Sequence, residues 1–589
     1  MFASTRLQGL VLLLCVGTVA CSDAPDALVA DVVIIQPPTP AAGPAGPAHC
    51  AYESETQRPW RAPTPGAVQA GVARVVLDVP IGTPLAPYGG RLKALGGIPV
   101  DDRESPLTTA FVPSVGIQSS PAATALVLQA GDELLVWVKL DLGLSVETLL
   151  YDLEARLADA VPGGLAGHVL VTVSHGHSGW GAYHPGQVMS LGADRFRPQV
   201  YGRILDGAEA AVRSALASLA PARIGLGIQD GWDPQRRIYD DRRPQNDGLP
   251  EDDGGAVGST RDERLWILRV DNDSGPLAAV VSFGFHGNIA REVNALASIE
   301  AGGLVELELQ ERLGPGVVVM HALSAAGDAD ATGVSSLPPC EVSPCADFAQ
   351  MESVGQLAAD TALALHASIE TSDRVGLSFA SRTVALGRDL EIREGALRYA
   401  PADAVPDRVV WTADGAIANP IDEFAAPDGA ALCGGATPDL PLSPIDGVED
   451  LSPWGTCVDL SLATGILTAL FGTQPGGTPF CETVRTVVGG LRLADIPLLT
   501  IGADGTQAQS DAEDVLVATL PGEPVSLWAR TFRERSPRGP ERTLLLGYAQ
   551  DYVGYLLSAE DWMSGGFEPS INVWGPLEGE FLMEHALAL

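Results

Sequence analysis

The sequence is poor in positive charge. Its 589 residues include 36 Lys and Arg against 74 Asp and Glu, a formal net charge of −38. A surface of this sign repels polyanions at long range, which excludes nucleic acid as a partner and disfavours anionic lipid headgroups. Because the acidic residues are spread along the chain, the pattern is typical of an acidic exported protein.

Long apolar runs are also lacking. The only candidate lies at the N-terminus, where Arg6 precedes a short apolar stretch from Leu10 to Val16 and small residues lead to Cys21. This pattern predicts that residues 1–21 are a secretory signal, too short to span a bilayer. Its end resembles a bacterial lipobox, so we expect a lipidated Cys21 and a place in the cell envelope, as an outer-membrane lipoprotein or a secreted protein.

Cysteine is scarce. Of the eight cysteines, two lie in the signal segment, and the other six have no paired CxxC units that would suggest a zinc knuckle. An even count in an exported chain predicts three disulfides, with the pairing left open. The six are Cys50, Cys340, Cys345, Cys433, Cys457 and Cys481.

Composition divides the rest of the chain. Residues 22–65 are rich in Pro and Ala and predict an extended tether. Residues 66–589 alternate strand and helix patterns, which predicts one α/β (mixed α+β) domain of mixed sheets flanked by helices. Within it, the patterns predict a strand at 73–80, a hairpin at 124–142 turning at Gly131-Asp132, helices at 145–161 (capped by Ser145) and 200–219, a strand at 168–173, a long loop at 232–264, and an irregular Cys-containing excursion at about 415–483.

Histidine is rare, yet three of the nine crowd into VTVSHGHSGWGAYHPG, residues 171–186. Five apolar strand candidates each precede a potential ligand or acid, and the carboxyl ends of strands in α/β sheets converge on one crevice. Two histidines, a carboxylate and a further oxygen are a reasonable zinc set. A histidine that ends a strand is more often a hydrogen-bonded core residue, so the pattern alone leaves a metal site as a hypothesis. The residues are His175 and His177, His286, Asp328, Glu523, and Tyr552 with Tyr555.

Six blocks, in order over residues 73 to about 575, resemble the neutral (non-lysosomal) ceramidases. VTVSHGHSGWG is similar to their THTHSGPGG loop, and LDVPIGTPLAPYGGR to their first strand and glycine turn. VSFGFHGN with SIEAGG is similar to NFAVHGT…SADFPG, and SAAGDADA lies where they have GDVSPN. VATLPGEPVSLWAR and GYAQDYVGYLLSAEDW resemble VPGEFTTMSGRR and GLxNxYxxYxTTxEEY. The order of the blocks makes the resemblance specific.

The resemblance implies Zn²⁺ as cofactor and assigns roles position by position. The zinc ligands fall on His175, His286, Glu523 and Tyr555. His177 would polarise the substrate carbonyl or protonate the leaving group, and Asp328 would orient His177 or the attacking water. His184 has no counterpart and is interpreted as a loop histidine.

Three departures stand out. The family's serine in GDVSP falls on Asp330, which puts ceramide hydrolysis in doubt. A carboxylate there could act as a base or bind a cationic or polyol group. The family's Asn-Arg anchor has no clean match, and Arg236-Arg237 is the candidate. We expect no C-terminal Ig-like domain, because the chain ends shortly after Tyr555.

These patterns predict an exported zinc-dependent hydrolase, resembling neutral ceramidase, that cleaves an amide or ester bond of an acylated lipid or other small acylated substrate. The alternative is a non-catalytic surface lipoprotein that keeps the fold and binds a lipid or glycan. A serine hydrolase is disfavoured, because no G-x-S-x-G is present. Membrane contact is expected only through the lipid anchor, and the sequence does not give the oligomeric state.

Overall fold

The computed structural model describes residues 52–93, 103–186, 189–243, 261–332, 345–387 and, with short gaps, 390–399 and 483–589. Between 400 and 482 it describes 432–433, 457–458, 469 and 471. The predicted signal segment, most of the tether and most of the 415–483 excursion lie outside the described residues. Among the described helices, none combines the length and apolarity that crossing a membrane requires.

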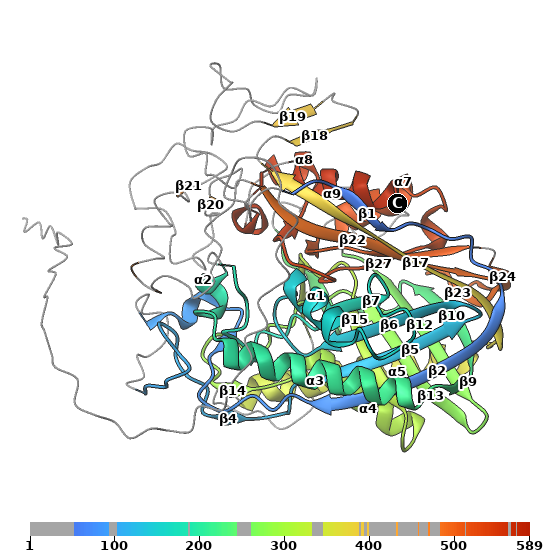
Figure 1. Ribbon diagram of the computed structural model, residues 1–589, viewed down its shortest axis with the longest axis horizontal. Coiled ribbons are helices and arrows are strands. Elements are labelled where there is room, and N and C mark those ends of the chain that lie inside the picture. Colours follow the sequence, from blue (N-terminus) through green and yellow to red (C-terminus); the bar gives the residue numbers. More distant parts are fainter. Residues whose placement is uncertain are drawn as a thin grey trace, which may run out of the picture. The chain divides into compact units, whose positions relative to one another are not determined.

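Two large β-sheets form the centre of the domain (Figure 1). The ten-stranded sheet has the order β27 (Thr543–Leu546), β25 (Val515–Thr519), β22 (Thr483–Ala494), β17 (Arg374–Gly387), β2 (Gly66–Val76), β5 (Ala122–Ala130), β6 (Glu133–Leu140) and β7 (Val169–Val173), with β1 (Glu55–Arg58) on β17 and β9 (Ala220–Pro221) on β2. The six-stranded sheet has the order β15 (Val318–Leu323), β13 (Gly275–Phe283), β12 (Arg264–Asn272), β10 (Arg223–Asp230), β23 (Ile496–Ile501) and β24 (Gln507–Ala512).

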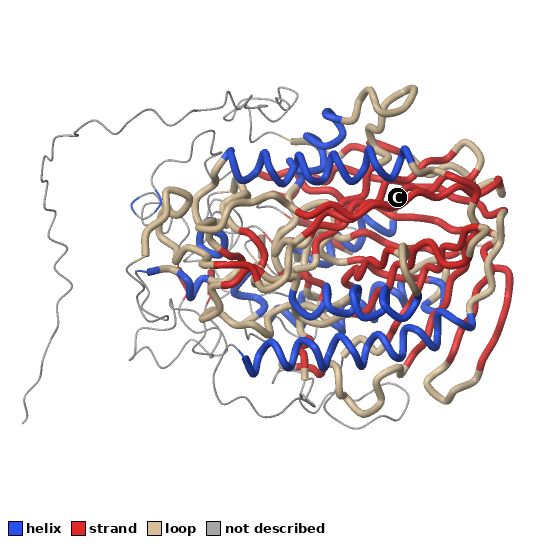
Figure 2. The backbone as a smooth tube through the Cα atoms, turned by 90° about the horizontal axis from the view of Figure 1, so that it is seen from below, coloured by secondary structure: helices blue, strands red, loops and turns tan. Residues whose placement is uncertain are grey.

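The sheets pack face to face and helices cover their outer faces, as Figure 2 shows. Leu126 and Trp137 of the ten-stranded sheet share a buried cluster with Leu226 and Val280 of the other sheet. Alternate residues of each strand therefore face two different apolar layers, which explains the near-continuous apolar runs in the sequence. The helices are α1 (Glu147–Arg156), α2 (Ser190–Ala193), α3 (Pro198–Ala217), α4 (Glu300–Leu313), α5 (Cys345–Ser368), α7 (Ser526–Arg535), α8 (Ala559–Met563) and α9 (Glu578–Leu587), with 3₁₀ turns η2 (Gly89–Arg91), η7 (Pro540–Arg542) and η8 (Glu568–Ile571).

Six short strand pairs lie outside the two large sheets in the described part of the chain. These are β3 (Leu85–Ala86) with β8 (Gly179–Trp180), β4 (Gly116–Ile117) with β14 (Leu296–Ala297), β11 (Tyr239–Asp241) with β16 (Ala329–Ala331), β18 (Leu390–Ile392) with β19 (Leu397–Tyr399), β20 (Leu432–Cys433) with β21 (Cys457–Val458), and β26 (Glu523–Pro524) with β28 (Tyr555–Leu556). In the fifth pair, Cys433 is the cross-strand partner of Cys457.

The predicted mixed α/β architecture is confirmed, and so are the hairpin with its turn at Gly131 and the helix now seen as α3. Two details were wrong. Glu55–Arg58, inside the predicted tether, form β1 and pair with β17, so the fold begins before residue 66. Ser145 does not cap α1: its hydroxyl donates to the Asp551 carbonyl, while the Asp551 carboxylate accepts from Glu147 N at 3.1 Å.

The free edge of β15 is closed by two side chains of α4. Glu306 Oε1 accepts from His321 N at 2.7 Å, and Gln310 Oε1 accepts from Val319 N at 3.0 Å. The same Glu306 oxygen lies 2.7 Å from Nζ of Lys139, a fully buried lysine of β6 in the other sheet that also pairs with Asp141. One side chain therefore satisfies a strand edge and links the two sheets.

Candidate metal centre

Three candidate ligands and a tyrosine that contacts two of them lie just beyond the carboxyl ends of four strands. His175 follows β7, His286 follows β13, Glu523 follows β25, and Tyr548 follows β27. His175 and Tyr548 have left-handed backbones, with φ of 48° and 53°. Such a conformation costs a non-glycine residue of order 1–3 kcal/mol and persists only where its surroundings hold it. The surroundings here are main-chain bonds from Val173 N to Tyr548 O (3.2 Å) and from Tyr548 N to Gly522 O (2.8 Å).

Three histidines meet at one point. Nε2 of His175 lies 3.2 Å from Nε2 of His286 and 3.2 Å from Nε2 of His177. The candidate ligand atoms of all three lie within 4.8 Å of one another, and all three rings are buried. Nitrogen atoms at this spacing share a single small site.

Two of the histidines present a lone pair to that site. Nδ1 of His175 donates to the Gly143 carbonyl at 2.6 Å, and Nδ1 of His286 donates to the Ala326 carbonyl at 3.1 Å. With the proton on Nδ1, Nε2 of each ring is free to bind a cation, the arrangement common among metal-ligating histidines. Burial lowers the pKa of both rings, so they are neutral at neutral pH.

Glu523 completes a tetrahedral spacing. Its Oε2 lies 3.4 Å from Nε2 of His175 and 3.8 Å from Nε2 of His286. Ligands held at about 2.1 Å around one tetrahedral zinc ion are separated by about 3.4 Å. The residues present therefore fit a zinc-sized cation, and the chemistry of two imidazoles and one carboxylate suits it.

Tyrosine hydroxyls hold the Glu523 carboxylate in place. Tyr548 donates to Oε2 at 3.1 Å, and Tyr552 donates to Oε1. The Tyr548 ring also lies against His175, with centroids 4.5 Å apart. Tyr548 was not among the sequence candidates, although it follows the strand RTLLL as the other site residues follow theirs. It touches two candidate ligands at once.

His177 belongs to the same cluster. It lies as near to His175 as His286 does, and its Nδ1 makes no hydrogen bond within the described part of the chain. Its main chain is fixed, because His177 N donates to Gly287 O at 2.7 Å and the buried Arg91 guanidinium donates to His177 O at 2.5 Å. Burial, and then the neighbouring histidines, lower its pKa well below the usual value. The geometry accommodates a fourth-ligand role as well as the predicted role toward substrate.

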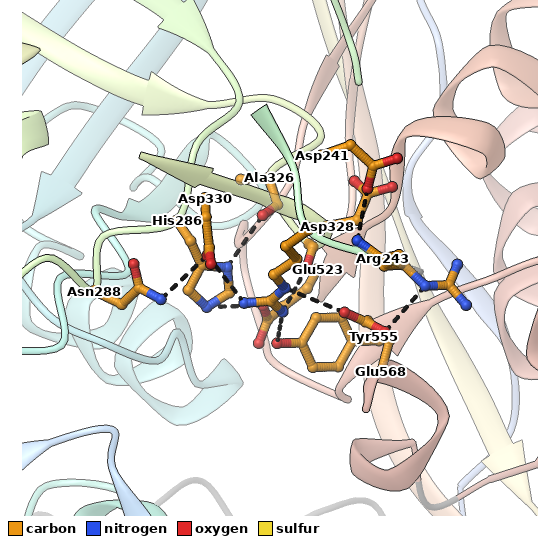
Figure 3. Close-up of polar contacts among 12 residues, drawn as sticks. Asp241, Arg243, His286, Asn288, Ala326, Asp328, Asp330, Glu523, Tyr555 and Glu568 are labelled. Atoms are coloured by element: carbon orange, nitrogen blue, oxygen red, sulfur yellow. Dashed lines mark hydrogen bonds and ion pairs between the residues drawn. The ribbon is translucent and has the colours of Figure 1, made fainter. Parts of the chain in front are cut away.

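Tyr555 lies opposite Glu523 in the β26–β28 pair and contacts an arginine (Figure 3). Nη2 of Arg242 donates to the Tyr555 hydroxyl at 2.9 Å and to Gly327 O at 2.7 Å. Burial and the Glu523 charge raise the pKa of Tyr555, and the Arg242 charge opposes them. Of the candidate anchor arginines, Arg236 pairs with Asp240 at 3.5 Å, and the arginine that contacts Tyr555 is Arg242.

The two aspartates of SAAGDADA have different surroundings. Asp328 is fully buried and accepts from Ser526 N (2.9 Å) and Ser526 Oγ (2.8 Å) at the start of α7. Burial and the nearby Asp241 raise its pKa to about 7. In the described part of the chain its carboxylate accepts hydrogen bonds from Ser526 of α7 and not from His177, and its predicted role toward the attacking water stays a prediction. Figure 3 shows it beside Arg243.

Asp330 lies at the exposed edge of the metal centre. Its Oδ1 accepts from Nη1 of Arg242 and from Nδ2 of Asn288, both at 3.3 Å, and 45% of its side chain is exposed. Asn288 lies two residues beyond His286, so the Asp330 carboxylate is hydrogen-bonded to the segment that carries a candidate ligand. His184 is outside the three-histidine group: it is buried, its Nδ1 accepts from Gly186 N at 3.0 Å, and burial lowers its pKa to about 3.

No protein-family model matches the chain. A neutral ceramidase of Mycobacterium tuberculosis is 25% identical over 188 residues, which are 32% of this chain and 29% of that protein. A neutral ceramidase of Pseudomonas aeruginosa is 22% identical over 484 residues, which are 79% of this chain and 65% of that protein. The chain thus spans less than two thirds of the length of these curated relatives.

Solved structures of ceramidases are similar to this chain in fold. The crystal structure of neutral ceramidase from Pseudomonas aeruginosa matches with a TM-score of 0.62 at 17% identity, covering 88% of this chain and 73% of that one. A ceramidase complexed with C2 matches with a TM-score of 0.61 at 17% identity, covering 88% and 74%. In sequence and in fold, the chain is similar to the neutral ceramidases.

Proposed function

We propose that the chain is an exported zinc-dependent hydrolase that cleaves the amide bond of an N-acyl lipid of the ceramide type, or a related ester bond. The supporting observation is the buried group of His175, His286 and Glu523 at tetrahedral spacing, at the converging ends of the strands. The relatives named neutral ceramidase favour an acylated lipid as substrate. In this proposal, residues 1–21 direct export and Cys21 carries the lipid anchor.

His175, His286, Glu523 and Tyr555 would hold the ion. When bound, zinc supplies a Lewis acid that lowers the pKa of a water ligand to about 7. The chain's own residues prepare the site: Tyr548 and Tyr552 orient the carboxylate, and the carbonyls of Gly143 and Ala326 fix the imidazole tautomers.

His177 contributes a neutral imidazole. In this proposal its ring N–H donates to the substrate carbonyl, or the ring takes up the proton released by the attacking water and gives it to the leaving amine. Arg91 keeps the ring in place through the His177 carbonyl, and Arg242 keeps Tyr555 in place through its hydroxyl. Asp330, half-exposed beside Asn288, would accept hydrogen bonds from a hydroxyl or amine of the substrate.

Asp330 also supports the second candidate, a non-catalytic lipid- or glycan-binding lipoprotein. This position carries a serine in the family that the sequence resembles, and a carboxylate cannot replace the serine hydroxyl as a hydrogen-bond donor once it is ionised. Turnover separates the two candidates, because only the first requires it.

The test combines metal analysis with hydrolysis. Purified protein should contain about one zinc per chain, since the described residues include one such group of histidines. It should release fatty acid from N-acyl sphingoid or simple acyl ester substrates, and lose that activity with a chelator. His175→Ala should abolish both zinc content and turnover, whereas His184→Gln, a matched change of a buried histidine outside the cluster, should keep both. Zinc-free protein with an intact fold would refute the metal proposal, and zinc-loaded protein without turnover would favour the lipoprotein.

A further inference from the structure

Large apolar side chains that are exposed are few, and they gather in one area. In the described part of the chain six such residues are more than a third exposed. Four of them lie on three neighbouring loops: Ile81 (55% exposed), Val115 (43%), Ile117 (44%) and Val293 (45%). Single exposed aliphatics are ordinary, but a group marks a surface that contacts something. We call these four residues the aliphatic rim.

The three loops of the aliphatic rim are joined by hydrogen bonds. Gly82 N donates to Ser114 Oγ at 3.0 Å, and Ser114 N donates to Thr83 O at 3.1 Å. Val115 N donates to Ala295 O at 2.9 Å, and β4 pairs with β14, with Ile117 opposite Ala297. The rim is therefore a built surface and not a set of independent loop tips.

One buried arginine, Arg91, connects the aliphatic rim to the metal centre. Its third loop runs on directly from His286, and the buried Arg91 guanidinium donates both to Asn294 O in that loop (3.3 Å) and to His177 O (2.5 Å). Ser298 N donates to Ser178 O at 2.9 Å. The loops of the rim are thus hydrogen-bonded to the segment that carries His175 and His177.

We propose that the aliphatic rim docks the protein on a zwitterionic lipid surface, from which the acylated substrate enters the metal centre. The proposal rests on the function proposed above. The rim consists of aliphatic side chains, and the adjoining centre is proposed to act on an acylated lipid, which favours a lipid surface as its occupant. With a net charge of −38, the chain is repelled by anionic bilayers, so the lipid surface that we propose is electroneutral. Burying the four side chains in the acyl boundary supplies the attraction.

The experiment measures partition of the full chain onto phosphatidylcholine vesicles. All variants carry Cys21→Ser, so that an acyl anchor does not mask the rim. The test variant is Ile117→Asp with Val293→Asp, which removes two exposed aliphatics and adds two charges. The matched control is Leu307→Asp, a 37% exposed leucine on α4 away from the three loops. Since only exposed side chains change, circular dichroism should show that both variants are folded.

We expect the rim variant to partition at least about tenfold more weakly than the parent, and the control to partition as the parent does. Hydrogen exchange with vesicles should slow in residues 80–84, 113–118 and 291–297. Hydrolysis of a water-soluble short-chain substrate should be unchanged in the rim variant, while hydrolysis of vesicle-embedded substrate falls.

Equal partition of rim variant and parent overturns the proposal, and so does an equal loss in the Leu307→Asp control. A parent that is dimeric and becomes monomeric on rim substitution, without any vesicle effect, assigns the surface to a second copy instead. Vesicle binding that depends on the rim but comes without turnover of any substrate refutes the proposed hydrolase function and leaves the rim proposal standing.

Discussion

The hydroxyl of Tyr548 offers a sharp test of the metal centre. Tyr548→Phe keeps the ring that packs on His175 and removes only the hydrogen bond to Glu523 Oε2, the oxygen nearest the two histidines. A hydrogen bond to a charged group contributes roughly 1.5–3 kcal/mol. If that energy holds the carboxylate in its ligand position, zinc should bind about 10- to 100-fold more weakly, the range found for residues that orient metal ligands.

The assay is competition for zinc between the metal-free protein and a fluorescent chelator. Tyr201→Phe is the matched control, because Tyr201 is also buried and its hydroxyl also donates to a carboxylate, Asp152, at 2.7 Å, but on α3 and outside the histidine cluster. The control should lose some unfolding free energy and no zinc affinity. If Tyr548→Phe is folded and binds zinc within about threefold of the parent, the tyrosine does not orient Glu523 and our reading of the centre is wrong.

Four further outcomes are expected. His177→Gln should keep zinc and lose turnover if His177 acts on substrate; loss of zinc would make it a ligand. Asp330→Ser should raise hydrolysis of N-acyl sphingoid substrates relative to simple esters, and unchanged rates on every substrate would show that Asp330 has no role. The Asp328 pKa is raised to about 7, so its stabilising contribution is present below about pH 4 and is lost as pH rises to about 7. In urea unfolding the parent should therefore lose about 4 kcal/mol of unfolding free energy relative to Asp328→Asn over that range. A difference between the two proteins that does not depend on pH would contradict the shift. Cys433 and Cys457, cross-strand partners, should form a disulfide detectable by non-reducing peptide mapping, and free thiols at both would exclude it.

Much of the fold could be predicted, because strand signals were strong where both faces are buried. β7, predicted from the run HVLVTVS, ends two residues before His175, and β13, predicted from LAAVVSFGF, ends three residues before His286. The same logic would have found Tyr548 after RTLLL. The sequence could not predict the direction in which a side chain points from a loop. A left-handed backbone at Tyr548 turns its side chain toward Glu523, and nothing in the letters GYAQD indicates that turn.

Side-chain partners were predicted less well than positions. Asp328 was placed in the correct loop, but its carboxylate bonds Ser526, about two hundred residues away in the sequence, and only the packing of α7 decides this contact. Arg242 lies five residues beyond the predicted anchor in a charged loop with several arginines, and periodicity cannot choose among them. Both are long-range contacts of polar groups, which depend on tertiary packing more than on local pattern.

The pairing of Glu306 with the edge of β15 has a consequence for association between molecules. An uncovered edge strand presents N–H and C=O groups that can template a strand from another chain. Here Glu306 and Gln310, one helical turn apart, occupy the amides of His321 and Val319. Resistance to edge-to-edge aggregation therefore depends on α4 remaining packed against β15. Because Glu306 also pairs with Lys139, a substitution of Glu306 would both expose the edge of β15 and leave a buried cation less well paired.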